Sequence, residues 1–410
     1  MRPFTVNGPM LLAACALGLL LSACASSGTS VTPPKGTTST VVGEVRSTAN
    51  EPIADVTVFV DQTTTRVASK ADGTFRLPGI GLGMQRVVFY HPDFEFGTVL
   101  VDPVVQGSDT LRVILGPRAA ATPQATAPGA HGLGPVEVPE PDEALPASPP
   151  STPSSRARAI DQFERLFLGT HEECTLETPD VLDAKMDRDG TVRVQSTQPV
   201  SVSNDRLGYD VQIILDRVVL NQTPNGVNRQ AEAHLQFTPQ VETAAVTAPT
   251  RAAREEAYIG SFPHFLAALV EGRLFQEGLD YEIPVGGAEQ SRGLAGAAGG
   301  GGLVEGWAEF RNPDRLFSYI PASAVVVFES TGVRRIVHRS RAGLQRAYAR
   351  KFVGAADALG RPVSFYEVRT NPTRLTLAGN VVSGRSVNRQ GAWANTPVCY
   401  QLPLDYRPNR

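Results

Sequence analysis

Histidine and carboxylate side chains are the usual ligands of a catalytic metal ion, and this chain has six histidines. A zinc hydrolase needs such ligands at short spacing, together with a general base. No two of the histidines lie within one helical turn of each other, and His171-Glu172-Glu173 lacks a His-x-x-Glu spacing. No Gly-x-Ser-x-Gly motif is present either. The sequence therefore predicts no metal site and no serine hydrolase.

The most polar group of the main helical stretch comprises Arg254, Glu256, Tyr258 and His264. Arg254 and Tyr258 are i,i+4 neighbours, so both side chains lie on one side of a helix. Two interpretations stay open for the group. It is either a ligand-binding cluster or, as the sequence favours, a buried Arg–carboxylate pair that anchors the helix to a sheet.

Reactive thiol chemistry is predicted at Cys24. A leading charge at Arg2, an apolar run from Met10 to Leu21 and small residues before Cys24 form an export signal. Leu21-Ser22-Ala23-Cys24 resembles the lipobox of bacterial lipoproteins, in which the cysteine is lipidated and becomes the first mature residue. The alternative is an ordinary signal peptide with a cysteine there by chance. Several acyl chains on one residue would anchor the protein firmly.

Two further cysteines, Cys174 and Cys399, would lie in the exported part of the chain. An even number of cysteines in an oxidising compartment makes a disulfide between them plausible. Two buried free thiols are the alternative.

Composition divides the chain into five segments. Residues 1–23 are the predicted leader, and the Ser/Thr/Pro/Gly-rich residues 24–40 form a flexible tether. Residues 117–155 are a proline-dense linker between two globular parts, 41–116 and 156–410. We expect this linker to space the two parts rigidly.

The fold class predicted is mainly β, with an α+β second part. Alternating apolar and polar residues with intervening turns predict seven short antiparallel strands, packed as a sandwich, in the first part. These strands are expected near 41–46, 56–60, 65–69, 74–77, 86–90, 98–101 and 111–115.

A resemblance supports this sandwich. Gly43-x-Val45, Pro52-Ile53-x-Asp55-Val56-x-Val58 and the segment from Ser69 to Leu77 are similar to the carboxypeptidase-like regulatory domain. That resemblance implies a prealbumin-like fold of the carbohydrate-binding-like superfamily. Lys70 departs from the acidic residue usual at its position, which weakens any claim of a metal or specific polar role there.

The second part should begin with a helix over 156–168 and then form β-strands. The apolar stripe over 250–278 predicts one long helix, and Pro263 predicts a kink or a break near Ser261. This part resembles the extracellular region of Bacteroidetes-type lipoproteins with the same regulatory domain. The residues that carry the resemblance are Phe167-Leu168-Gly169, the segments 204–209 and 254–261, His264-Phe265 and Leu402-Pro403-Leu404-Asp405-Tyr406.

The net charge of −3 gives no basic footprint for nucleic acid, and no motif calls for a cofactor. We therefore expect a non-enzymatic protein that is lipid-anchored in the bacterial cell envelope. The non-acidic Ala25 after Cys24 resembles the outer-membrane class of lipoproteins, so the outer membrane is the expected location. Its expected partner is a glycan or another envelope protein. The alternative is an envelope hydrolase with a site in the second part.

Overall fold

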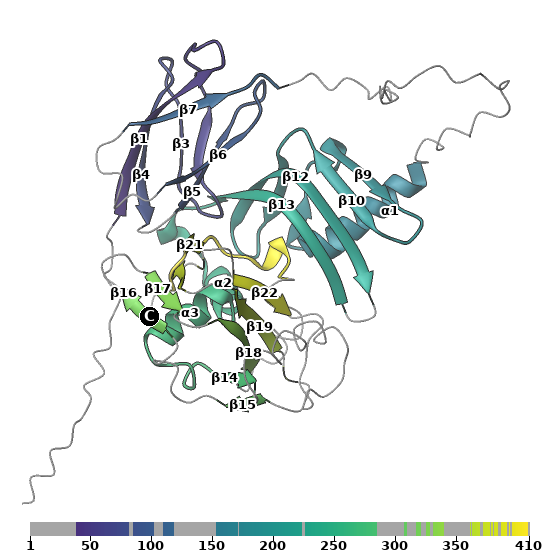
Figure 1. The fold of residues 1–410 in the computed structure, drawn as a ribbon. Coiled ribbons are helices and arrows are strands. Elements are labelled where there is room, and N and C mark those ends of the chain that lie inside the picture. The colour runs from purple at the N-terminus through teal and green to yellow at the C-terminus, as the bar shows by residue number, and fades with distance from the viewer. Residues whose placement is uncertain are drawn as a thin grey trace, which may run out of the picture.

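The fold is taken from a computed structural model of the chain. It describes residues 38–81, 85–101, 110–118, 153–170, 172–223, 226–284, 307–309, 317–320, 325–328, 331–339, 361, 363–369, 372–377, 379, 381–383, 387–391, 393 and 396–408. Most of the regular structure is β, arranged in several sheets, with three α-helices among the described residues (Figure 1). The predicted mainly β fold class is thereby confirmed.

Two sheets in the first part face a common apolar core. Their inward side chains, such as Val45, Phe75 and Phe89, are almost fully buried together. One sheet has the strand order β4 (Thr74–Gly81), β1 (Thr38–Ser47) and β7 (Leu111–Leu115). The other has the order β3 (Arg66–Ala68), β2 (Thr57–Val60), β5 (Gln85–Tyr90) and β6 (Gly97–Val101).

The expectation that all strands of this part are antiparallel is wrong, because β1 and β7 pair in parallel. Gly43 shows why their backbones approach so closely. A Cβ atom at Gly43 would lie 2.4 Å from the Leu111 carbonyl oxygen and 2.6 Å from the Phe75 ring, so no larger residue fits. Alternation of apolar residues identifies a strand's buried face but not the direction of its neighbour.

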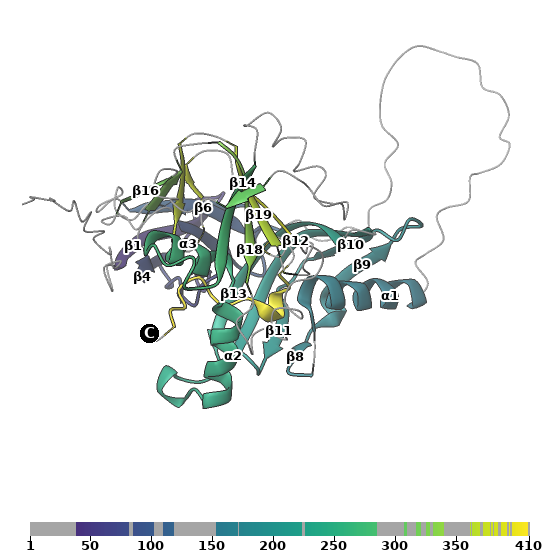
Figure 2. The same ribbon diagram turned by 90° about the horizontal axis from the view of Figure 1, so that it is seen from below.

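The second part opens with α1 (Pro153–Phe163), followed by a wider turn over Glu164–Leu168 that ends at Gly169. Helix α1 lies along one side of a large antiparallel sheet (Figure 2). Its path runs β8 (Cys174–Leu176), β11 (Val200–Asn204), β12 (Tyr209–Thr223), β10 (Val192–Ser196) and β9 (Leu182–Met186), and β13 (Gly226–Pro239) pairs with β12.

The stretch predicted as one long helix, with a kink or a break near Ser261, forms two helices, α2 (Ala248–Tyr258) and α3 (Phe262–Val270). Gly260 between them has a positive φ of 77°, which ends the first helix. Ser261 caps the second helix by accepting a hydrogen bond from the His264 backbone N–H at 3.2 Å. Pro263 then lies in the first turn, where its missing N–H costs nothing.

Helix α3 shares a core with two further antiparallel sheets, through residues that include Phe265, Leu269, Tyr366 and Trp393. One sheet has the order β15 (Trp307–Glu309), β14 (Leu279–Pro284), β18 (Gly332–His338), β19 (Val363–Val368) and β22 (Val387–Gly391). The other has β16 (Phe317–Ile320), β17 (Val325–Phe328), β20 (Thr373–Thr376) and β21 (Val381–Ser383).

The first part docks directly on the second (Figure 1). The turn after β2 makes the contact through backbone hydrogen bonds. The Gln62 N–H donates to the Leu235 carbonyl at 2.7 Å, and the Gln62 carbonyl accepts from the Leu404 N–H at 2.7 Å. Asp61 accepts from the Leu235 N–H at 3.0 Å and lies 2.9 Å from His234 Nδ1. The expectation of two parts held apart by the linker is therefore wrong.

Candidate functional site

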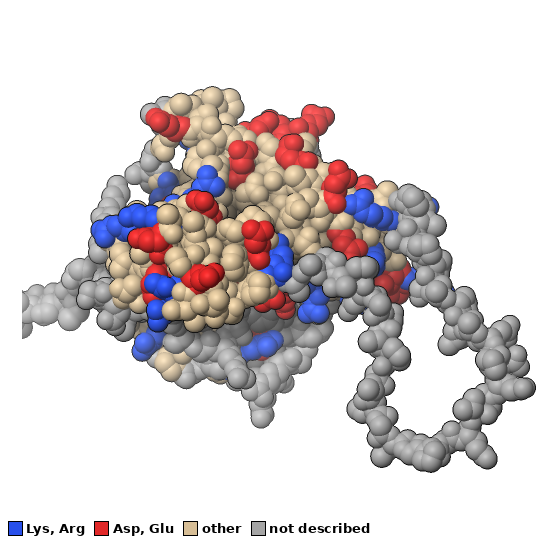
Figure 3. Space-filling model, turned by 90° about the horizontal axis from the view of Figure 1, so that it is seen from above, with Lys and Arg blue, Asp and Glu red and all other residues tan. Residues whose placement is uncertain are grey.

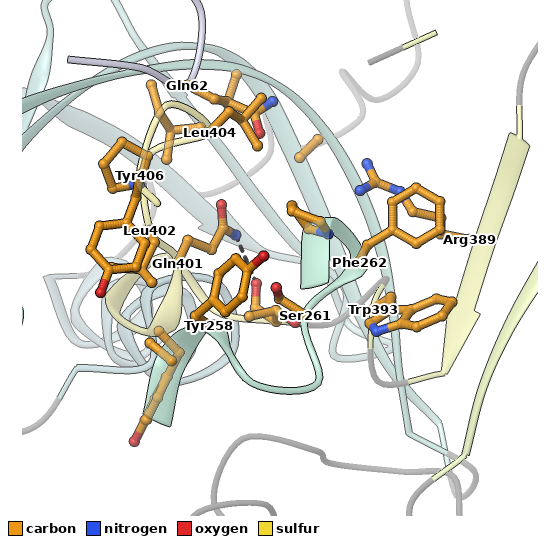
Figure 4. Close-up of a pocket in the computed structure, with 18 of the residues that line it drawn as sticks. Gln62, Tyr258, Ser261, Phe262, Arg389, Trp393, Gln401, Leu402, Leu404 and Tyr406 are labelled. Carbon is orange, nitrogen blue, oxygen red and sulfur yellow. Dashed lines mark hydrogen bonds between the residues drawn. The ribbon is translucent and has the colours of Figure 1, made fainter. Parts of the chain in front are cut away.

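A cavity of about 340 Å³ lies where the first part, the β12–β13 hairpin, helices α2 and α3 and the C-terminal segment meet (Figure 4). Gln62 comes from the first part, β13 supplies one wall, and Tyr258 and Phe262 come from the ends of α2 and α3. Arg389 of β22 and the segment 396–407 complete the lining. The volume falls at the lower end of ligand pockets, which span about 300–1,000 Å³.

The C-terminal wall is held in place by contacts with the large sheet. Cys399, in the short 3-10 turn Val398–Tyr400, forms a disulfide with Cys174 of β8. The Cys399 carbonyl also accepts a hydrogen bond from Asn204 Nδ2 at 2.9 Å. The disulfide and this hydrogen bond hold the beginning of the segment 396–407 against the large sheet. The hydrogen bond from the Leu404 N–H to the Gln62 carbonyl holds the same segment nearer its end.

Aromatic rings form an apolar side of the cavity. The Phe262 and Trp393 rings have centroids 5.0 Å apart in an edge-to-face arrangement. Trp393 Nε1 donates to the Gly260 carbonyl at 2.8 Å, so the indole is fixed by the same turn that separates α2 from α3. Figure 4 shows Arg389 beside Phe262 on one side of the cavity, with Tyr258, Gln401 and Leu402 on the other.

Arg229 projects from β13 into the lining. Its guanidinium carbon lies 4.1 Å from the centroid of the Phe167 ring, and Nη1 donates to the Thr396 carbonyl at 3.3 Å. Burial lowers the pKa of Arg229 to about 10 because the charged form loses hydration. Within the described residues, no carboxylate lies within 4.0 Å of it.

Arg389 is the second cation of the lining. Its guanidinium carbon lies 5.3 Å from the centroid of the Phe262 ring. The side chain is exposed to solvent, and the protein atoms packed around it shift the pKa of Arg389 downward. It too lacks a carboxylate within 4.0 Å in the part of the chain that the structure describes. Because arginine supplies nearly all basic residues of this chain, the sequence gives no signal that singles out these two.

The structure separates the four residues of the polar group predicted on the main helix. Tyr258 lines the cavity, whereas Arg254, Glu256 and His264 do not. Arg254 is buried and donates from Nε to the Leu207 carbonyl at 2.7 Å, with its guanidinium 4.2 Å from the Tyr209 ring centroid.

The other two hold neighbouring segments. Glu256 pairs with Arg206 at 2.6 Å. His264 is buried, accepts from the Gly260 N–H at 2.9 Å and lies 3.3 Å from Glu277. The predicted anchoring of helix to sheet is therefore present, but backbone carbonyls, not a carboxylate, receive the Arg254 guanidinium.

The structure also brings together a serine and a histidine, the residue types of a hydrolase, that the sequence did not single out. His338 Nε2 lies 2.9 Å from Ser364 Oγ across the β18–β19 pair, the distance between a nucleophile and its base. Both side chains are 0% exposed, so no substrate reaches the hydroxyl. In the described part of the chain, no group of three or more His, Cys, Asp or Glu side chains is placed to hold a metal ion.

Cys24 lies outside the described residues. Among the described helices, none is both long and apolar enough to cross a membrane. Compared with known proteins, the chain matches no protein-family model and no curated protein. The cavity therefore has to be interpreted from its own residues.

Proposed function

We propose that this protein is a non-enzymatic, lipid-anchored component of the bacterial cell envelope that binds a glycan. The lipobox-like sequence ending in Cys24 supports the anchor, and the cavity of about 340 Å³ supports the binding role. A pocket of that size suits one or two sugar rings better than the broad surface of another protein. Aromatic walls suit the apolar C–H face of a sugar ring, and hydrogen-bonding groups such as Tyr258 and Gln401 suit its hydroxyl groups.

The first part adds to this proposal. We propose that its seven strands form a prealbumin-like sandwich of the carbohydrate-binding-like superfamily. A three-stranded and a four-stranded sheet around one core support that assignment, while the parallel β1–β7 pair departs from the antiparallel pattern expected of it. Gln62 brings this part into the cavity wall, so both parts would take part in binding.

We favour binding over the alternative, an envelope hydrolase. The polar residues of the main helix that such an enzyme would use are engaged in packing contacts, Glu256 with Arg206 and His264 with Gly260. The Ser364–His338 pair is sealed in the protein interior.

The anchor is tested by replacing Cys24 with alanine and fractionating the cells. We expect the variant to leave the membrane fraction because it lacks the acyl chains. A C24A protein that stayed on membranes would contradict lipid anchoring.

Binding is tested on a glycan array with the full chain in detergent. Ala231 is exposed and lines the cavity, so Ala231→Trp should fill the space and abolish the array signal. Ala68 is exposed on β3 away from the lining, and Ala68→Trp should leave the signal intact. An empty array, or a signal equal in the two variants, would argue against glycan binding in the cavity.

A further inference from the structure

Among the described residues, the charged side chains that line the cavity are all positive. Its described lining includes Arg229, Arg389 and Arg407 but no aspartate or glutamate. The neighbouring cavity of about 330 Å³ instead combines arginines with Glu255 and Asp405. On the face of the molecule in Figure 3, acidic and basic side chains are likewise interspersed. The accumulation of positive charge is therefore a property of this cavity and not of the protein as a whole.

One of these arginines, Arg229, is placed at a cost to folding. Removing a guanidinium from water is unfavourable unless an opposite charge or several acceptors replace the lost hydration. Arg229 receives one carbonyl acceptor and an aromatic face, and Arg389 receives an aromatic face. Arg254 shows how the same fold satisfies a structural arginine, with two backbone carbonyls and a ring. A ligand anion would supply the charged acceptor that Arg229 lacks and an opposite charge for Arg389, which is exposed to solvent.

We propose that the cavity binds an acidic sugar, whose anionic group is held by Arg229 and Arg389 and whose ring packs against Phe262 and Trp393. Guanidinium groups form paired hydrogen bonds with carboxylate and with phosphate oxygens, so the shared chemistry is a sugar that carries either group. This inference rests on the proposed glycan-binding function and narrows it to acidic glycans.

The test is calorimetric titration of the full chain in detergent with three probes. Cellobiouronic acid carries a carboxylate, cellobiose 6′-phosphate carries a phosphate, and cellobiose is the neutral counterpart of both. We expect one of the acidic probes to bind at least about tenfold more tightly than cellobiose, because hydrogen bonds to charged groups contribute about 1.5–3 kcal/mol. The better of the two acidic probes identifies the anionic group.

Arginine variants locate the binding. Arg229→Gln and Arg389→Gln should each weaken the acidic probe by about tenfold to a hundredfold and leave cellobiose unchanged. Arg158, exposed on α1 outside the cavity, provides the matched control, and Arg158→Gln should change neither affinity.

A stability measurement separates a binding arginine from a structural one. Arg229→Met keeps an unbranched chain beside Phe167 but removes the charge. We expect it to melt at or above the temperature of the unsubstituted protein without ligand, and to lose the acidic probe. A lower melting temperature would assign Arg229 to folding and overturn the proposal.

The remaining outcomes distinguish this inference from the proposed function. Equal affinity for cellobiose and the acidic probes, abolished by Ala231→Trp, would overturn the acidic specificity and leave glycan binding in place. No heat from any probe at millimolar concentration, with an empty glycan array, would overturn both.

Discussion

Two arginines of this protein differ in the number of hydrogen-bond acceptors around the guanidinium, and this number separates a structural arginine from one that lines the cavity. Arg254 is 7% exposed and its guanidinium meets the Leu207 and Gly208 carbonyls and the Tyr209 ring. Arg229 has a similar aromatic neighbour in Phe167 but only one carbonyl, and its pKa is lowered to about 10 by burial. The first arrangement stabilises the fold, whereas the second lacks the acceptor that we propose an anionic ligand supplies.

Replacing Arg254 with alanine should lower the free energy of unfolding by about 3 kcal/mol, because it leaves two carbonyls without their charged donor and removes a cation–π contact. Urea denaturation measures the change. Arg251, one turn earlier and exposed, is the control, and Arg251→Ala should cost less than about 1 kcal/mol. Equal losses in the two variants would show that Arg254 does not anchor α2.

At the scale of elements, the break between α2 and α3 creates the site. It turns the chain so that Tyr258 at the end of one helix and Phe262 at the start of the next both line the cavity. The Gly260 N–H donates to His264 and its carbonyl accepts from Trp393, so this turn is bonded on both sides. A continuous helix would direct these side chains differently.

Gly260 itself is open to a test. Gly260→Ala should lower the free energy of unfolding by about 1–2 kcal/mol, since a residue with a Cβ is strained at a φ of 77°. Gly116 lacks a positive φ, and the nearest atom to an added Cβ is 3.6 Å away, so Gly116→Ala should stay within about 0.5 kcal/mol. Thermal unfolding followed by circular dichroism gives both values. A neutral Gly260→Ala would mean that the turn tolerates another conformation.

At the scale of the whole molecule, two parts that the sequence separates with a linker share hydrogen bonds and an apolar contact. Phe59 and Val88 of the first part pack with Ile214 of the second. Thr64 Oγ1 donates to Asp405 at 2.5 Å, which ties the first part to the C-terminal wall of the cavity. Docking of the first part therefore adds Gln62 to the cavity wall and braces the C-terminal segment that forms another side of it.

Asp61 is the residue that tests this docking. Asp61→Ala should destabilise the intact chain by about 2 kcal/mol, because the buried Leu235 N–H loses its acceptor and His234 its partner. Asp93, whose side chain is 83% exposed on the same part, is the control, and Asp93→Ala should have little effect. Urea unfolding of both full-length variants checks the difference. An unchanged midpoint for Asp61→Ala would show that the parts do not stabilise each other.

The Cys174–Cys399 bond joins positions 225 residues apart. In the chain-entropy account, closing so long a loop in the unfolded state stabilises the fold by about 5 kcal/mol. Reductant should therefore lower the urea midpoint of the unsubstituted protein strongly. It should have no effect on a Cys174→Ser, Cys399→Ser double variant, which should already be destabilised. Insensitivity of the unsubstituted protein to reductant would contradict this role.

The local pattern of the sequence determined much of the fold. Alternation of apolar residues located strands such as β5 and β7, and Pro263 marked the boundary between α2 and α3, because both signals depend on neighbours a few positions apart. The helical stripe also placed Tyr258, Phe262 and Phe265 among apolar surroundings, where the structure has them.

Only the tertiary structure decided the parallel pairing of β1 with β7, the docking of the two parts and the position of the cavity. Gln62, Arg229, Phe262 and Arg389 are far apart in the sequence, and no spacing rule connects them. A periodic pattern reports which face of an element is buried but not which element covers it. The candidate site depends on which elements cover one another, so its positive charge and its aromatic wall follow from the tertiary structure and not from the sequence pattern.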